Sequence, residues 1–196
     1  MRRASTDALL WEPTPPRVAV LRAGVPAAEW PAAGGLDPAA ERLYAALAAH
    51  VACEPLGALG NDQVAALWRV PAGRPAAVER QELAQLLAAV AAATGYRVAL
   101  GVADGRGPAL IAARRARAGG VEQVPAGASA LYLAPLPVAL LPVSAGLRVR
   151  LEQFGLHTLG ALAALPLGPV QAQFGPEGRL AWLIARGRDT RPVTPR

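Results

Sequence analysis

The chain has 196 residues, enough for one large domain or two small ones that need neither a disulfide nor a metal for stability. Hydrophobic residues make up 53% and charged residues 17% of the chain, a composition that excludes a disordered protein. All 20 basic residues are arginines, which excludes a P-loop lysine, a Schiff-base lysine and a lysine general base.

Alternating strand and helix patterns run through residues 17–125. Residues 1–16 are expected to be a flexible N-terminus, and residues 23–37 a Gly- and Pro-rich loop whose Asp37 caps the following helix. Period-two and helical spacings predict these elements in order: strand 17–21, helix 38–51, strands 54–59 and 63–70, helix 76–94 closed by Gly95, strand 96–102, helix 107–117 and strand 121–124. On helix 107–117 we expect Leu110 and Ile111 to point inward and Arg114, Arg115 and Arg117 outward.

The strand signal stops after Pro125. Short helical segments are expected at about 127–133, 136–141, 145–154, 158–165, 168–173 and 176–186. The uncharged run Gln123–Leu147 is long enough to suggest a membrane helix, but four prolines interrupt its helical hydrogen bonding. We therefore predict no membrane contact.

These patterns predict an α+β fold in which a small mixed sheet with helices precedes a helical domain. The sheet domain is expected over residues 17–131 and the helical domain over residues 132–187, with residues 188–196 as an extended exit tail. The names sheet domain and helical domain are used below for these two ranges.

Cysteine and histidine are too few for a Cys/His zinc site. The chain has Cys53, His50 and His157, and a catalytic pairing of Cys53 with His50 is disfavoured because their spacing is a common accident. A single cysteine is typical of a reducing compartment, and Met1–Asp7 has no apolar core for a signal peptide. We expect a cytoplasmic protein with no metal and no cofactor.

The net charge of +6 is unevenly distributed. Residues 1–131 hold 13 arginines and 11 acidic residues, whereas residues 132–196 hold seven arginines and three acidic residues. Arginine in place of lysine also reflects GC-rich coding, so the asymmetry counts for more than the basicity itself. It predicts an anionic partner on the C-terminal side.

A helix, a tight turn and a second helix are predicted across Arg148–Leu162. Gly155 permits a positive φ in the turn, Thr158 is a good N-cap, and Leu156 and Leu159 fill the space between the helices. Such a hairpin offers helix N-terminal N–H groups to a phosphate, and a second candidate hairpin is Pro142–Leu147. An αα-hairpin inside a helical core gives the same pattern. The candidate DNA-binding residues are Ser144, Gly146, Arg148, Arg150, Gly155, His157, Thr158 and Arg179.

From Leu100 onward, several motifs follow one another in a set order. They are Gly101–Asp104, Ala109–Arg114, Tyr132–Pro142, Leu151–Pro166, Phe174–Leu180 and Ala185–Pro195. In this order they resemble the palm-to-thumb passage of Y-family translesion DNA polymerases, especially the ImuB-like branch, over about half of the chain. The closing Arg-Gly-x-Asp-x-x-Pro-Val is fairly specific. The resemblance implies a palm-like sheet domain and a thumb-like helical domain with helix-hairpin-helix turns, without fingers or little finger.

The departures from this family concern its metal-binding carboxylates. Its polymerases hold two Mg²⁺ ions on an Asp-bearing first strand, which is followed by an aromatic steric gate, and on a later Ser-x-Asp-Glu. Here strand 17–21 has no acidic residue, and the second carboxylate position aligns near Trp68 or Arg69. Asp62 and Glu54 are expected to be solvated turn residues. The resemblance thus implies a shortened relative with no catalytic residue and no metal site.

ImuB-like proteins are non-catalytic adaptors in damage-induced mutagenesis, and the resemblance implies the same role here. The expected partners are DNA, bound weakly through its backbone, and a RecA-like, ImuA′-type protein or an error-prone polymerase. A sliding-clamp peptide at Gln81–Leu87 is disfavoured because this segment has the pattern of a core helix. Two alternatives stay open: a pure protein-interaction module without DNA contact, and an active nucleotidyl transferase dependent on Asp62. The oligomeric state is not predicted.

Overall fold

The computed structural model describes residues 14–25, 38–58 and 62–195. Most of the expected N-terminus (1–13), the loop that includes Asp37 (26–37) and the hairpin tip (59–61) lie outside the described residues. The elements of the sheet domain are β1 (Arg17–Gly24), α1 (Pro38–Ala48), β2 (Glu54–Ala58), β3 (Gln63–Arg69), α2 (Ala76–Thr94), β4 (Arg97–Asp104), α3 (Arg106–Arg115), β5 (Val121–Gln123) and α4 (Ser129–Leu133). Those that follow are η2 (Val138–Leu140), α5 (Ala145–Gln153), α6 (Leu159–Ala164) and α7 (Leu167–Ala185).

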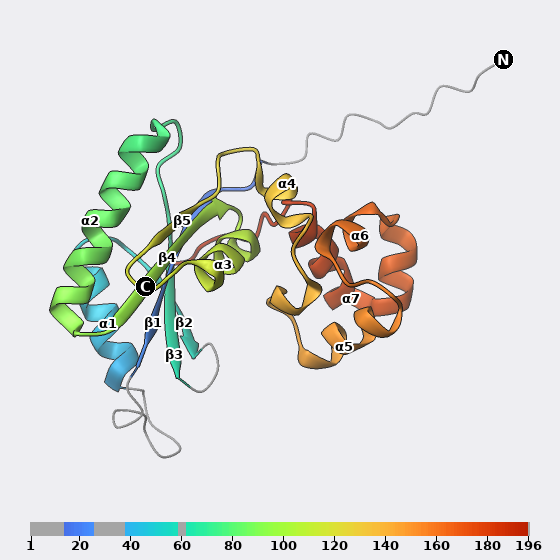
Figure 1. Ribbon diagram of the computed structural model, residues 1–196, viewed down its shortest axis with the longest axis horizontal. Coiled ribbons are helices and arrows are strands. Elements are labelled where there is room, and N and C mark those ends of the chain that lie inside the picture. The colour runs from blue at the N-terminus through green and yellow to red at the C-terminus, as the bar shows by residue number, and fades with distance from the viewer. Residues whose placement is uncertain (1–13, 26–37, 59–61, 196) are drawn as a thin grey trace.

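The fold is α+β, as predicted, and its centre is a five-stranded mixed sheet in the order β2-β3-β1-β4-β5 (Figure 1). β1 pairs antiparallel with both β3 and β4, which places Gly24 opposite Gln63 and Arg97 at one end of the sheet. β5 pairs parallel with β4 after the crossover through α3. β2 pairs antiparallel with β3.

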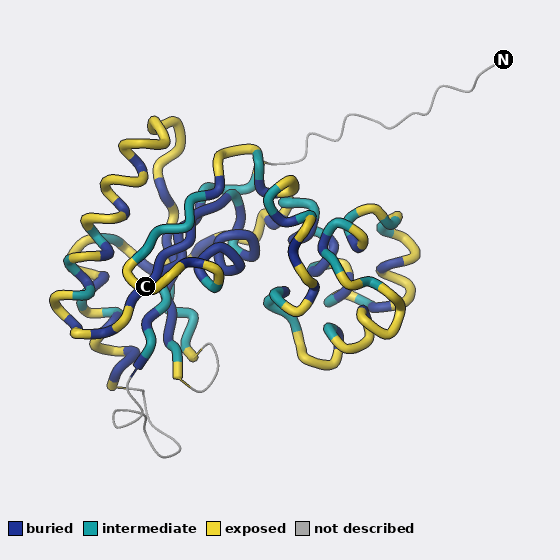
Figure 2. Tube along the Cα trace, viewed as in Figure 1, coloured by how far each residue is buried: buried dark blue, intermediate teal, exposed yellow. Residues whose placement is uncertain are grey.

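Each face of the sheet has its own hydrophobic core, because successive strand side chains point to opposite sides. On one face Leu21 and Trp68 belong to a core covered by α1 and α2. On the other face Val20 and Leu67 pack in a core with α3. Figure 1 shows α1 and α2 on one side of the sheet and α3 on the other, and Figure 2 shows the strands as the most continuously buried part of the chain.

α3 approaches β4 closely because Gly101 has no side chain. A Cβ built at Gly101 would lie 2.6 Å from the carbonyl oxygen of Ala109 and closer still to the backbone of Ala113. Gly95 ends α2 with φ 72°, which confirms the predicted C-cap. Leu110 and Ile111 are buried as expected, whereas Arg114 is half-buried rather than outward-pointing. Arg114 donates to the carbonyl oxygen of Leu140 at 3.1 Å, a contact that no helical pattern could indicate.

The helical domain has a single described core that also includes Ile111 of α3. Fully buried leucines fill it: Leu133, Leu141, Leu151, Leu159 and Leu162. α7 is kinked at Gly175 (φ 68°), immediately before Pro176, which accounts for the two shorter helices predicted there. The two domains are therefore joined by shared packing as well as by the chain.

The C-terminal tail, residues 188–195, contains no helix or strand and packs back against the sheet domain. The carboxylate of Asp189, 1% exposed, accepts a hydrogen bond from the backbone N–H of Gly107 at 2.7 Å and pairs with Arg191 at 2.8 Å. Val193 is buried in the core on the α3 side. The N–H of Thr194 donates to Glu54 at 2.6 Å. In Figure 1 the red C-terminal segment runs from the helical domain back across the sheet.

The uncharged run Gln123–Leu147 forms β5, α4, η2 and the start of α5 rather than one long helix. Among the helices of the described ranges, none combines the length and the hydropathy needed to cross a bilayer.

Candidate nucleic-acid interface

The predicted hairpin of the helical domain lies between α5 and α6. Gly155 turns the chain with φ 76°, as expected, and Thr158 caps α6 by accepting from the N–H of Ala161 at 3.2 Å. Two helices joined by a turn therefore lie where the sequence predicts them.

The N–H groups in the first turn of α6 donate to carbonyl oxygens inside the protein. The N–H of Leu159 donates to the carbonyl oxygen of Leu136 at 2.8 Å, and that of Gly160 to Ala134 at 2.9 Å. A Cβ at Gly160 would lie 2.8 Å from the same Ala134 oxygen, so this close approach requires glycine. The turn thus docks onto residues 134–138, and α6 has no free N-terminal donors in its first turn.

The second candidate hairpin starts at Ser144, the N-cap of α5. Its hydroxyl accepts from the N–H of Leu147 at 3.1 Å. Its own N–H and hydroxyl donate to the carboxylate of Glu177 on α7, at 2.6 and 2.8 Å. A carboxylate at a helix N-terminus is favoured by the helix dipole. Glu177 therefore lies where a phosphate would approach Ser144 and Gly146.

Arg148 and Arg150 donate to backbone carbonyl oxygens. Arg148 donates to Leu141 at 3.2 Å and to Val143 at 2.6 Å. Arg150 donates to Gln173 at 2.7 Å, and its guanidinium lies 5.3 Å from the ring centroid of Phe174. Neither contacts a carboxylate within the described part of the chain, so their charge is not neutralised by an ion pair.

Seven of the eight predicted residues fall into three groups, and Arg150 lies between two of them. Ser144, Gly146 and Arg148 lie on the first turn of α5; Gly155, His157 and Thr158 lie at the opposite end, with exposed Arg150 between them. Arg179 is exposed on α7 and borders a separate hollow of about 360 Å³ that is also lined by Arg188 and Arg191. The structure joins the first two groups along α5 and leaves Arg179 apart. Their contact with DNA stays a prediction.

Sequence reasoning missed Glu177 and Arg114, whose partners lie 33 and 26 positions away along the chain. No local pattern signals either contact. The exposed ring of Phe154, 57% accessible and packed edge-on against Phe174, was also missed.

Asp62 and Glu54, the two acidic residues that the sequence analysis considered near the metal positions, lie far apart. Asp62 is exposed where β3 begins, and its carbonyl oxygen accepts from the N–H of Val25 just beyond β1. Glu54 pairs with Leu67, which lies five residues after Asp62 along β3. At the rise of a strand, this places Glu54 about 16 Å from Asp62. Within the described ranges, no three His, Cys, Asp or Glu residues come close enough to hold a metal ion.

Glu54 is also not the solvated turn residue that the sequence predicted. Both of its carboxylate oxygens accept from Arg106, at 2.6 and 3.1 Å, in a bidentate pair that connects β2 to α3. Trp68 and Arg69, near which the second metal carboxylate was aligned, lie at the other end of β3 from Asp62. Trp68 is buried in the core and Arg69 is exposed.

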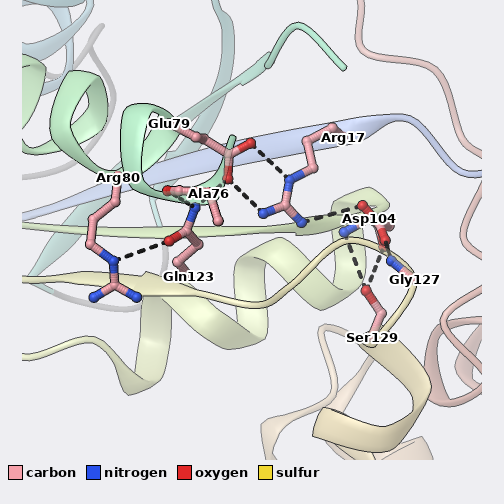
Figure 3. A network of polar contacts seen from close by, with 8 residues as sticks. All are labelled: Arg17, Ala76, Glu79, Arg80, Asp104, Gln123, Gly127 and Ser129. Atoms are coloured by element: carbon pink, nitrogen blue, oxygen red, sulfur yellow. Dashed lines mark hydrogen bonds and ion pairs between the residues drawn. The ribbon is translucent and has the colours of Figure 1, made fainter. Parts of the chain in front are cut away.

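A polar network holds the start of the interdomain connection (Figure 3). Arg17 on β1 donates to Glu79 on α2 at 2.6 and 3.1 Å and to Asp104 at the end of β4 at 3.3 Å. Asp104 also accepts from the N–H of Gly127 at 2.6 Å. Burial alone would raise the pKa of Glu79, but hydrogen bonds from Arg17 and Gln123 outweigh burial and lower that pKa. This network fixes residues 125–129, which lead into the helical domain.

The fold just described is that of a Y-family polymerase palm with its thumb. Two solved structures of DinB polymerases from Sulfolobus solfataricus superpose on it with TM-scores of 0.61 and 0.66. The first covers 79% of this chain and 46% of the polymerase at 17% identity; the second covers 90% and 68% at 12% identity. At these identities the likeness shows the fold alone.

Curated relatives extend the likeness to sequence. The chain is 36% identical over 105 residues to DNA polymerase IV of Dehalococcoides mccartyi (strain CBDB1), and 35% identical over 104 residues to DNA polymerase IV of Alkalilimnicola ehrlichii. Each match covers 53% of this chain and 27% or 29% of the relative. No family model matches the chain.

In sequence the chain is similar to DNA polymerase IV over about half of its length, and in fold it is similar to DinB polymerases of the Y family. The alignments span between a quarter and a third of the curated relatives, so the activity of those enzymes is not thereby assigned to this chain.

Proposed function

We propose that the chain is a non-catalytic adaptor of translesion synthesis that contacts DNA weakly through its helical domain and recruits protein partners. The observation that carries the proposal is the placement of acidic residues in a polymerase-like sheet. β1 has no carboxylate at any of its eight positions, and Asp62 and Glu54 lie too far apart to share a metal ion. A polymerase-like sheet whose first strand bears no carboxylate supports a non-catalytic role.

The proposed DNA contact is supported by the polymerase relatives and by the arginines of the helical domain. Arg148 and Arg150 have no carboxylate partner among the described residues, so each retains donors that can bind a phosphate oxygen. Two or three such contacts give weak, salt-sensitive binding without sequence preference.

The DNA contact is tested by fluorescence anisotropy with labelled primed and single-stranded DNA at several salt concentrations. We expect log K to fall with log salt at a slope of about −2 to −3. Arg148→Ala combined with Gly155→Glu should abolish binding. Arg69→Ala combined with Gln85→Glu is the matched control, because it changes the net charge equally at two exposed positions of the sheet domain. Equal loss in both variants would contradict a contact through the helical domain.

The absence of catalysis is tested by primer extension with Mg²⁺ or Mn²⁺. We expect no extension from the purified chain under conditions in which a DNA polymerase IV extends the same primer. Extension that disappears in Asp62→Ala would establish a nucleotidyl transferase and overturn the non-catalytic part of the proposal.

The adaptor role is tested by mixing the purified chain with a RecA-like, ImuA′-type protein and with an error-prone polymerase encoded beside its gene. Co-elution as a stable complex is the expected result. If neither protein binds, recruitment is excluded even where DNA binding holds.

A pure protein-interaction module is the second candidate, and specific observations favour it. The N–H groups of α6 are engaged internally, and Leu131 (80%), Phe154 (57%) and Val149 (52%) expose apolar surface on the helical side of the molecule. Undetectable DNA binding at low salt together with a stable protein complex would select this candidate.

A further inference from the structure

Two arginines from different domains donate to carbonyl oxygens of residues 140–143, which run from the end of η2 toward α5. Arg114, on the last turn of α3 in the sheet domain, donates to the carbonyl oxygen of Leu140 at 3.1 Å. Arg148, on α5 in the helical domain, donates to those of Leu141 at 3.2 Å and Val143 at 2.6 Å. The loop at residues 140–143 thus holds two guanidinium groups that come from opposite sides of the domain junction.

These two charges repel each other and have no carboxylate partner in the described structure. Burial lowers the pKa of Arg114, and the nearby positive charge of Arg148 lowers it further. Arg17 provides the contrast: burial would lower its pKa too, but hydrogen bonds and charge from Glu79 and Asp104 outweigh burial and raise it. A half-buried pair of like charges costs free energy unless an anion lies between them or beside them.

The donors left over on this pair suit one particular kind of anion. Each guanidinium has five N–H donors, and each of these arginines uses a single terminal nitrogen on the loop. Arginine binds the oxygens of phosphate with two parallel hydrogen bonds, and two arginines together can bind three phosphate oxygens. A tetrahedral oxyanion therefore matches the unused donors better than a carboxylate does.

We propose that Arg114 and Arg148 form a phosphate clamp across the junction of the sheet and helical domains. The bound phosphate belongs to the DNA backbone, which rests on the proposed function; inorganic phosphate offers the same oxygens. The clamp places one DNA contact on α3, outside the hairpins, and makes the relative position of the two domains part of the binding site.

DNA affinity and its salt dependence give the first test, in the full chain. Arg114→Gln and Arg148→Gln should each weaken binding to primed DNA about 5- to 10-fold and reduce the salt slope by about one. The double variant should lose little more than either single variant, because both side chains hold one phosphate. Arg69→Gln, an exposed arginine at the end of β3, is the control and should change affinity less than twofold.

Inorganic phosphate gives the second test without DNA. Millimolar phosphate should raise the melting temperature of the wild-type chain above that in equal ionic strength of chloride, and this shift should vanish in Arg114→Gln. Arg114→Lys restores the charge, so it should recover the salt slope while losing part of the affinity. Circular dichroism confirms that each variant is folded.

The outcomes separate the clamp from the proposed function. If Arg114→Gln binds DNA as tightly as wild type with an unchanged slope while Arg148→Gln weakens binding, the clamp is overturned and the DNA contact stands. If the wild type binds no DNA but phosphate stabilises it through Arg114, the clamp stands and the DNA contact fails. If phosphate changes the melting temperature of neither the wild type nor Arg114→Gln, and DNA affinity is the same in both, the clamp is overturned. Arg114 and Arg148 then serve only to bind the carbonyl oxygens of residues 140–143.

Discussion

Two arginines of the sheet domain, Arg17 and Arg106, have a different kind of partner from the arginines of the helical domain, whereas Arg22 and Arg114 donate to backbone carbonyl oxygens as those do. In the sheet domain Arg17 and Arg106 form charge pairs with Glu79, Asp104 and Glu54. In the helical domain Arg148, Arg150 and Arg186 donate to backbone carbonyl oxygens and, within the described residues, contact no carboxylate. Carbonyl oxygens satisfy hydrogen-bond donors without neutralising the charge.

This difference separates stabilising charges from charges that are available for a partner. In the sheet domain, ion pairs connect β1 to α2 and β4, and a further ion pair connects β2 to α3. The helical domain keeps its positive charge next to solvent, where it attracts anions over a distance set by the ionic strength. The four predictions below test this contrast.

The largest expected effect comes from packing under α3. Gly101→Ala places a Cβ against the backbone of α3, so we expect a loss of about 3 kcal/mol or more in the free energy of unfolding. Gly146→Ala on α5 meets no atom within 4 Å and should stabilise the chain by about 0.5 kcal/mol. Urea denaturation of both variants measures the contrast. Equal changes in the free energy of unfolding would show that an added methyl group is accommodated as well at Gly101 as at Gly146.

Removing a buried carboxylate from the sheet domain should have the next largest effect. Glu79→Ala leaves Arg17, whose side chain is 8% exposed, with Asp104 as its remaining carboxylate, and should cost about 3 kcal/mol. Arg150→Ala removes an exposed charge from the helical domain and should cost less than about 1 kcal/mol. The measurement is again the free energy of unfolding, and a larger loss in Arg150→Ala would break the comparison.

The stability of the sheet domain should fall in acid. The pKa of Glu79 in the folded state lies below its ordinary value of 4.5, so the unfolded chain binds more protons in this range. The contribution of Glu79 is therefore complete above about pH 4.5 and is lost as the pH falls through the lower folded-state pKa. Thermal unfolding from pH 7 to pH 3 should show this decline, and it should be smaller in Glu79→Gln. An identical acid profile in that variant would exclude Glu79 as its source.

The smallest expected effect concerns Glu177 at the N-terminus of α5. Glu177→Gln removes a negative charge from the place where a phosphate would approach Ser144, and should increase DNA affinity roughly 2- to 5-fold. Glu152→Gln, an exposed carboxylate near the other end of α5, is the charge-matched control. Anisotropy titration at low salt measures both. Equal increases would indicate a general charge effect rather than a role of this helix end.

Most elements were predictable because their signals are local. The predicted helix 76–94 closed by Gly95 matches α2 to the residue, and the predicted strand 63–70 is one residue longer than β3. β1 was predicted three residues too short because Ala23 and Gly24 lack strand character, yet both are paired on each side by β3 and β4.

The candidate site was predictable in outline but not in its donors. Gly155 and Thr158 gave the turn and the cap correctly. That the N–H groups of Leu159 and Gly160 are already bonded to residues 134–136 depends on how the chain folds back, which no spacing within the hairpin encodes. The same is true of Asp189, whose motif was recognised while its role in binding Gly107 was not.

The sequence by itself determined the order of strands and helices, the glycine-dependent turns and the shortage of acidic residues along β1, because each depends on neighbours a few positions away. The tertiary structure decided which charges are neutralised. Arg17 meets Glu79 across 62 positions, Arg114 reaches Leu140 from another domain, and the tail returns to Glu54. Electrostatic contacts depend on distance in space, and folding sets that distance independently of separation along the chain.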